Sequence, residues 1–192
     1  MAQARTPRSS WIDEGLRALI RGGPEAVRIE PLARALGVSK GGFYWHFDDR
    51  QALLDEMLEA WEQALIDDVA EAIEAKDGDG DERSRLRRLF ALATSSSGEL
   101  AKPVGELMKI ELAIRDWARR DEAIAKRLRR VDNTRMSYMR PLFAAICEDE
   151  DEVEARCLLA LALFAGGPLV RVDHDGRSRS EVIESALELL IR

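Results

Sequence analysis

The stretch that decides the fold is Leu32–Phe47, which reads LARALGVSKGGFYWHF. A short helix is expected to begin near Pro31, because proline suits the first turn of a helix. Leu32, Ala33 and Leu36 lie on one face of this helix, and Gly37 ends it in a tight turn. A second short helix is expected over residues 40–47. Two short helices joined by such a turn form a helix-turn-helix, whose second helix can enter the major groove of DNA.

The second helix of the motif is predicted to have two different faces. Phe43 and Phe47 are four residues apart, so they share a face and pack toward the first helix. The opposite face then presents a cation, a glycine and three ringed side chains, which are Lys40, Gly41, Tyr44, Trp45 and His46.

Each residue on that opposite face suits contact with a nucleic acid. Ser39 is expected to cap the helix, whose first N–H groups would bind a phosphate, and Lys40 adds a positive charge. Gly41 and Gly42 let the backbone approach a duplex closely, and two glycines in one helical turn are costly without such a reason. The alternative is that the Tyr-Trp-His trio belongs to the core. Five consecutive ringed side chains cannot all point inward from one helix, so at least two are expected to face outward.

The charge distribution agrees with a DNA-binding N-terminus. The whole chain of 192 residues has a net charge of −7, which by itself argues against nucleic acid. Residues 1–50 nevertheless hold eight Lys and Arg against six Asp and Glu, a net of +2. The other residues hold 21 Lys and Arg against 30 Asp and Glu, a net charge of −9. The excess of basic residues is therefore in the N-terminal part of the chain, where the motif lies.

Residues 9–55 resemble the DNA-binding domain of TetR-family transcriptional repressors. The resemblance is carried by Gly37–Phe47 and by Arg50, Leu53 and Leu54 after it. It implies a homodimer of nine- or ten-helix subunits, a pseudo-palindromic DNA operator and, usually, a small-molecule inducer. It also implies that Tyr44, His46 and Arg50 contact phosphates.

The chain departs from the family before the first helix of the motif. The family usually has a threonine there, as a cap and phosphate contact, whereas this chain has Arg28 and Ile29. Arg28 can bind a phosphate instead of the threonine. At position 50 the family more often has a lysine, and Arg50 keeps the positive charge. The residues predicted to bind DNA are therefore Arg28, Ser39, Lys40, Gly41, Gly42, Tyr44, Trp45, His46 and Arg50.

The rest of the chain predicts an all-α protein with two domains. Strong helix formers dominate, and strict alternation of polar and apolar residues is hard to find, so no strand is expected. We expect a helix-turn-helix domain over residues 1–54 and a helical effector-binding and dimerisation domain over residues 55–192. The aspartates and glycines of residues 77–81 predict a solvated turn and not a calcium loop. Expected helices cover residues 10–21 (capped by Ser9 or Ser10), 51–75, 82–95, 103–118, 121–147, 151–172 and 179–191.

Two C-terminal segments are predicted to form a dimer interface. Residues 157–165 are apolar on every face, so this helix is expected to be buried all round. In proteins of the resembled family the last two helices of each subunit pair into a four-helix bundle. The alternative is burial within one chain. The apolar residues of the last helix are Val182, Ile183, Ala186, Leu187, Leu190 and Ile191.

Bulky, adaptable side chains in the middle helices predict a pocket for a small, mostly apolar effector. The alternative is plain core packing, and Glu111, which falls on the same stripe, can pair with Arg115 one turn later. The predicted ligand-binding residues are Trp61, Leu65, Leu107, Met108, Glu111, Trp117, Met136, Met139 and Phe143.

Other function classes lack support in the sequence. Two histidines and two cysteines make no metal cluster, and no catalytic triad or phosphate loop is visible, so we expect no enzyme, metal or cofactor. Cys147 and Cys157 are expected to be reduced structural thiols. No signal peptide and no membrane span are visible, so a cytoplasmic location is expected. A DNA-binding protein without an effector, an enzyme, and a helical interaction protein with a degenerate motif remain the alternatives.

Overall fold

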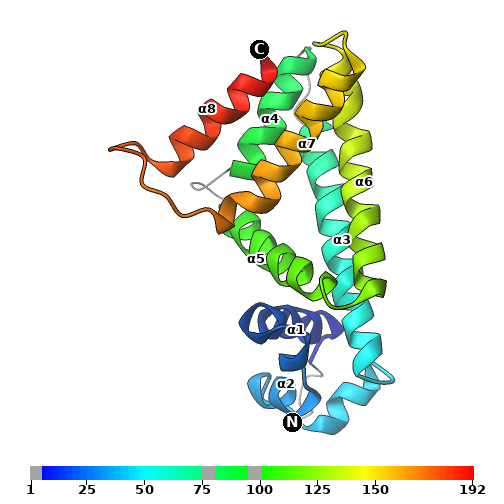
Figure 1. Cartoon of the computed structure of the whole chain (residues 1–192). Helices are drawn as coiled ribbons and strands as arrows, with labels where there is room; N and C mark the ends of the chain where they lie inside the picture. Colours follow the sequence, from blue (N-terminus) through cyan, green and yellow to red (C-terminus); the bar gives the residue numbers. More distant parts are fainter. Residues whose placement is uncertain (1–5, 75–80, 95–100) are drawn as a thin grey trace. The chain divides into compact units, whose positions relative to one another are not determined.

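The computed structural model describes residues 6–74, 81–94 and 101–192 of the chain. Every regular element within these residues is a helix (Figure 1), which confirms the predicted all-α class. Most of the predicted 77–81 turn lies outside the described residues. None of the described helices is both long and apolar enough to cross a membrane.

The chain divides into two compact units, and each is described by itself. The first unit comprises residues 1–64 and 109–125, and the second comprises residues 65–108 and 126–192. This is a division by packing. The functional boundary expected at residue 54 therefore stays a prediction.

The first unit contains the N-terminal helices and parts of three longer ones. We call residues 8–57 of this unit the head. The elements of the unit are α1 (Arg8–Gly22), the 3-10 helix η1 (Pro24–Ala26), α2 (Ile29–Ala35), the 3-10 helix η2 (Lys40–Trp45), the first part of α3 (Arg50–Glu74), the second part of α5 (Ala101–Ala118) and the first turn of α6 (Glu122–Ala144).

Helix α1 begins and ends with residues that explain its length. It begins at Arg8 after Pro7 and has no side-chain cap, so the predicted cap by Ser9 or Ser10 is wrong because both serines lie inside the helix. It ends as predicted before Gly23, whose φ of 68° lies in the left-handed region that favours glycine. At Gly15 a Cβ atom would come within 2.6 Å of the Met57 sulfur, so a missing side chain lets α1 approach α3.

The second helix of the motif differs from the prediction. Residues 40–47 were expected to form an α-helix, but the structure has a 3-10 helix over Lys40–Trp45. Glycine is among the poorest helix formers, and a 3-10 helix needs only short-range bonds such as those from Gly42 N–H to Ser39 O and from His46 N–H to Phe43 O, both at 2.9 Å. The Ser39 side chain makes no capping hydrogen bond, so that prediction is also wrong.

The second unit is built around one apolar core. Its elements include α4 (Glu82–Thr94), most of α6 (Glu122–Ala144), α7 (Glu150–Gly166), the 3-10 helix η3 (Gly167–Leu169) and α8 (Arg179–Ile191). Helix α4 packs against α8, and ion pairs join Arg87 to Glu188 and Arg140 to Glu154 at the surface. The core residues are Leu86, Leu89, Phe90, Met139, Leu142, Phe143, Val153, Cys157, Ala160, Leu187 and Ile191.

Helix α7 is shorter and more exposed than predicted. It ends at Gly166 and not near residue 172, because Gly166-Gly167-Pro168 interrupts the helix. The expectation that residues 157–165 are buried all round is wrong for the single chain. Cys157 and Ala160 are fully buried, whereas Leu158 and Leu159 are more than half exposed. One face of this apolar helix therefore packs on the core, and no described residue of its own unit covers Leu158 and Leu159 on the opposite face.

Candidate nucleic-acid interface

A buried pair of phenylalanines holds η2 in place. Phe43 and Phe47 stack with their ring centroids 5.2 Å apart, and both are almost completely buried. Trp11 of α1 meets Phe43 edge-on at 5.4 Å, a favourable aromatic geometry. This confirms the predicted inward face. Because Phe43 points inward, the two residues after it are turned outward.

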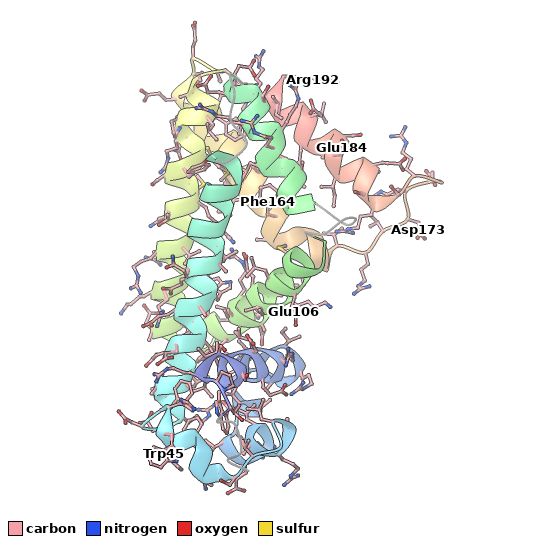
Figure 2. All side chains as sticks on the ribbon, turned by 180° about the vertical axis from the view of Figure 1, so that it is seen from behind. Trp45, Glu106, Phe164, Asp173, Glu184 and Arg192 are labelled. Carbon is pink, nitrogen blue, oxygen red and sulfur yellow. The ribbon has the colours of Figure 1, made fainter. Side chains whose placement is uncertain are left out.

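The outward face carries two large exposed aromatic side chains. Tyr44 is 54% exposed and Trp45 is 73% exposed, and Trp45 lies at the surface of the head in Figure 2. The alternative that this aromatic trio belongs to the core is therefore wrong for these two residues. Exposed large aromatic groups side by side on an ordered element mark a contact surface.

The turn before η2 depends on one glycine. Gly37 has a φ of 70°, which a side chain would strain, and the Val38 N–H donates to Ala33 O at 2.9 Å across the turn. Gly41 and Gly42 differ, because their φ values are ordinary. A Cβ at Gly41 would meet only the Ser39 hydroxyl, at 3.7 Å, among the described residues. The fold of this chain therefore gives no steric reason for a glycine at position 41.

Lys40 and Glu30 form an ion pair across the motif. The Lys40 ammonium lies 3.0 Å from the Glu30 carboxylate, and both side chains are more than half exposed. This hydrogen bond lowers the pKa of Glu30 and raises that of Lys40. Exposed pairs of this kind contribute little stability, typically about 0–1 kcal/mol, so a phosphate can compete for the lysine. Glu30 was not among the predicted site residues.

The other predicted phosphate contacts have partners within the head. The His46 ring donates from Nε2 to the Thr6 carbonyl at 2.9 Å, so a phosphate would have to replace Thr6 to accept from the same N–H group. Arg50 donates from Nε to Val27 O at 2.6 Å and from Nη2 to Pro24 O. These bonds tie the start of α3 to η1. Because a guanidinium has five N–H groups, they do not exclude a phosphate as a further acceptor.

Two polar groups near the motif escaped prediction. Arg8 of α1 donates to both Glu56 carboxylate oxygens and to the His46 carbonyl, and its guanidinium lies 4.6 Å from the centre of the Phe47 ring. Glu56 is 48 residues from Arg8, so no local spacing signals this pair. Glu14 is nearly buried and accepts hydrogen bonds from Arg17 at 3.2 Å and Arg21 at 2.9 Å. That cluster follows helical spacing and was recognisable in the sequence.

Residues 12–57, which contain the motif from Arg28 to Arg50, match the family described as "Bacterial regulatory proteins, tetR family". The match covers the N-terminal segment of the chain. This confirms the resemblance carried by Gly37–Phe47.

Two curated relatives are similar over about a third of this chain. Identity is 32% over 63 residues with the HTH-type transcriptional regulator AcrR of Shigella flexneri, a match that covers 33% of this chain and 29% of AcrR. It is 30% over 64 residues with the uncharacterized HTH-type transcriptional regulator TtgW of Pseudomonas putida, covering 33% of this chain and 48% of TtgW. The chain thus matches less than half the length of either relative.

Solved structures are similar over almost the whole chain. A transcriptional regulator from Saccharomonospora viridis, solved in complex with choline, has a TM-score of 0.76 at 19% identity and covers 96% of this chain and 94% of its own. A transcriptional regulator from Rhodococcus sp. Rha1 has a TM-score of 0.72 at 19% identity. This match covers 97% of the present chain and 94% of the Rhodococcus chain. At these identities the likeness shows a shared fold.

The nine predicted effector residues are divided between the two units. Trp61, Glu111 and Trp117 belong to the first unit and are nearly buried. The other six belong to the second unit, where Met139 and Phe143 lie in the core and Met136 packs against it, as the core-packing alternative expected. Glu111 accepts hydrogen bonds from Arg115 at 2.8 and 3.0 Å, which confirms the predicted pair.

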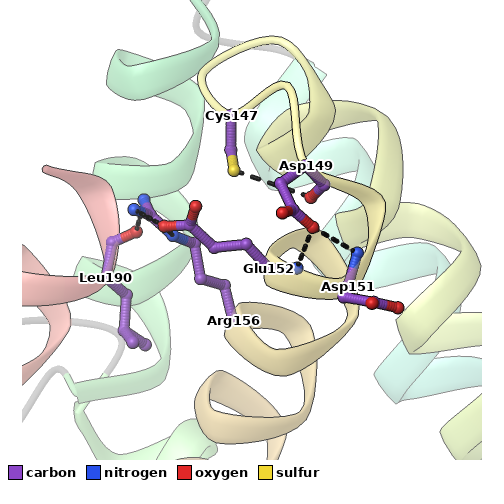
Figure 3. A network of polar contacts seen from close by, with 6 residues as sticks. All are labelled: Cys147, Asp149, Asp151, Glu152, Arg156 and Leu190. Atoms are coloured by element: carbon purple, nitrogen blue, oxygen red, sulfur yellow. Dashed lines mark hydrogen bonds and ion pairs between the residues drawn. The ribbon is translucent and has the colours of Figure 1, made fainter.

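A pocket of about 340 Å³ in the second unit is lined by none of these nine residues. Residues 81–83 and 144–148 line it instead. Beside it, the Asp149 carboxylate accepts from the Asp151 and Glu152 N–H groups, and Arg156 joins Glu152 to the Leu190 carbonyl (Figure 3). A hydrogen bond to Glu152 raises the pKa of Cys147, and burial raises the pKa of Cys157 to about 11. Both cysteines are free thiols, as predicted.

We predict that Arg50→Ala destabilises the head by about 1–3 kcal/mol, because it leaves the Val27 and Pro24 carbonyls without their charged donor. Urea unfolding followed by circular dichroism measures this change. Arg28→Ala is the matched control, since Arg28 is exposed and an exposed cation typically changes stability by about 0.5 kcal/mol or less. Equal stability of the two variants would show that the carbonyl contacts of Arg50 contribute nothing.

Proposed function

We propose that this chain is a DNA-binding transcriptional repressor that acts as a homodimer and is released from its operator by a small molecule. The observation that carries the proposal is the outward face of η2. There, Tyr44 and Trp45 are exposed next to two glycines, while Phe43 and Phe47 anchor the element from behind. Exposed aromatic side chains beside glycines on an ordered element favour contact with a DNA duplex over exposure to water.

The proposed contacts fall into two chemical groups. Arg28, Ser39, Lys40, His46 and Arg50 would bind phosphates, which position a protein on DNA without reading its sequence. Tyr44 would reach a phosphate or a base edge, and Trp45 would lie against bases or sugars in the major groove, where sequence is read. Gly41 and Gly42 would let the backbone come close to the duplex. The net charge of +2 within residues 1–50, against −9 elsewhere, would orient the head toward DNA during encounter.

The proposed homodimer explains an uncovered apolar surface in the second unit. On α7, Ala155, Leu158, Leu159 and Ala162 are exposed or partly exposed at helical spacing. On α8, Leu189 is 58% exposed. A patch of this kind on an ordered surface marks an interaction site, and a symmetric pair of such helices would cover it. A two-fold dimer would place two heads on inverted half-sites, which is why a pseudo-palindromic operator is proposed.

The proposed effector is supported by polar groups buried in the first unit. The indole N–H of Trp61 is buried and has no hydrogen-bond partner among the described residues. An unsatisfied buried donor costs about 1–3 kcal/mol, so it calls for an acceptor such as a ligand or a water. Glu111, only 2% exposed, adds a carboxylate in the same unit. We propose a small, mostly apolar effector with one polar group, and the choline bound to the S. viridis regulator supplies a first compound to test.

For DNA binding, we predict that Gly41→Ala separates affinity from stability. Alanine at a compatible glycine position raises stability by about 0.4–1 kcal/mol, whereas the added methyl would hold the backbone away from DNA and weaken binding about tenfold or more. Fluorescence anisotropy with DNA from the promoter of the chain's own gene measures affinity, and thermal unfolding measures stability.

Gly105→Ala is the matched control for this experiment. Gly105 lies on α5 outside the head, and a Cβ added there would meet no atom within 4 Å among the described residues. It should gain stability with unchanged DNA affinity. If Gly41→Ala and Gly105→Ala bind DNA equally well, η2 does not approach the duplex as proposed.

For the dimer, we predict that Leu189→Asp gives a folded monomer, because the charge replaces an exposed apolar side chain at the interface. Sedimentation velocity at micromolar concentration measures the mass, and circular dichroism checks the fold. Leu187→Asp would instead disrupt folding. The sequence placed Leu187 at the interface, but it is 2% exposed and lies in the core of its own chain. A dimer for Leu189→Asp, or a monomeric wild type, contradicts the proposal.

For the effector, we predict that a compound that releases DNA also changes tryptophan fluorescence, and that Trp61→Phe abolishes most of this change. Choline and a panel of small apolar amines and amides are the compounds to titrate. Trp45→Phe is the control, since Trp45 is an exposed residue of the head. Trp11 is kept, because it packs against Phe43 in the core. Compounds that change Trp61 fluorescence without altering DNA affinity would refute the coupling.

A further inference from the structure

The segment between α7 and α8 is a projecting arm with apolar side chains in solvent. We define the arm as residues 169–177. Leu169 is 69% exposed, Val170 is 54% exposed and Val172 is 56% exposed. The arm extends away from the helices of its unit in Figure 1, and Asp173 lies near its tip in Figure 2.

Hydrogen bonds fix both the base and the tip of the arm. At the base, the Arg179 guanidinium donates to the carbonyls of Gly167 and Val170. The arm then enters α8 through a capping box, in which Ser178 and Glu181 bind each other's N–H groups at 2.7 and 3.2 Å. At the tip, the Arg177 N–H donates to His174 O at 3.0 Å.

The backbone of the tip also has a defined turn. Asp175 and Gly176 have φ values of 47° and 85°, both in the left-handed region. The arm is therefore held in one shape while its three aliphatic side chains remain in water. A segment that is already ordered binds at a lower entropic cost than one that must first be ordered.

The exposed apolar residues of this unit are concentrated in one part of the chain. Among the described residues of the second unit, six large apolar side chains are exposed, and all lie between residues 158 and 189. Leu158, Leu159 and Leu189 lie on α7 and α8, and the other three lie on the arm. The arm thus carries half of them and directly connects the two helices proposed to form the dimer.

We infer that the arm packs on a second copy of this chain. Three exposed leucines supply only a fraction of the roughly 800 Å² per partner that a specific interface typically buries, and the arm between the two helices adds three more exposed aliphatic side chains. Because the arm joins α7 to α8, pairing of these helices with their symmetry mates brings each arm against the partner. This inference rests on the proposed dimer and adds a contact outside the helix bundle.

Site-specific photo-crosslinking on the full-length chain tests the contact. With p-benzoylphenylalanine at Val172, irradiation should give a covalent dimer on a denaturing gel. The same group at Arg129, an exposed position on α6, should give only monomer. A monomer band for position 172, from protein that sediments as a dimer, would overturn the inference while the dimer itself stands. A monomeric wild type would instead refute the proposed dimer.

A pair of arm variants provides a second readout. Leu169→Ser with Val172→Ser should raise the dimer dissociation constant about tenfold or more, since burial of aliphatic side chains is lost. Asp173→Ser, an exposed polar change on the same arm, should leave the constant unchanged. Because the substituted side chains contact solvent in the single chain, folding by circular dichroism should be unaffected. Equal dissociation constants for the two variants would overturn the inference.

Discussion

The stacked pair of Phe43 and Phe47 is the interaction on which the head depends. With the edge of Trp11 against Phe43, it fixes the rotation of η2 about its own axis. That rotation decides everything else about the motif. It turns Tyr44 and Trp45 into solvent and leaves Gly41 on an open face. The proposed DNA surface is thus a consequence of core packing on the other side of the same short element.

Arginines bound to backbone carbonyls recur at the junctions between elements. Arg50 holds η1 against the start of α3, Arg156 binds the last turn of α8, and Arg179 holds the base of the arm. Arg8 does the same for the His46 carbonyl. Helix ends and turns leave carbonyl groups without partners, and a charged donor satisfies them strongly. Near the motif, Arg8 and Arg50 therefore stabilise the fold of the head itself, whether or not they also contact DNA.

The second unit has an incomplete apolar surface. One face of α7 fills the core with Cys157 and Ala160, while the other exposes Leu158 and Leu159. Exposure of this kind is costly for an isolated chain and is removed when a complementary surface covers it. The arm adds three more exposed aliphatic side chains in the segment that follows α7. A partner that covers only the two helices would leave its three aliphatic residues in water, which is why a contact between arm and partner gives the more complete burial.

The sequence alone determined the features that arise from local pattern. The helical class, the glycine turn at Gly37, the inward phenylalanine pair and the Glu111–Arg115 pair all depend on residues within one or two helical turns of each other. The family likeness comes from the same short stretch. Tertiary structure decided the rest, since it sets which partner meets each side chain. In the folded chain Arg50 donates to carbonyl groups 23 and 26 residues away, and Arg8 pairs with Glu56. Folding also buries Leu187 in the core, while Leu189 and the aliphatic residues of the arm stay exposed. Helical spacing defines an apolar face but not what covers it, because that depends on elements distant in the chain.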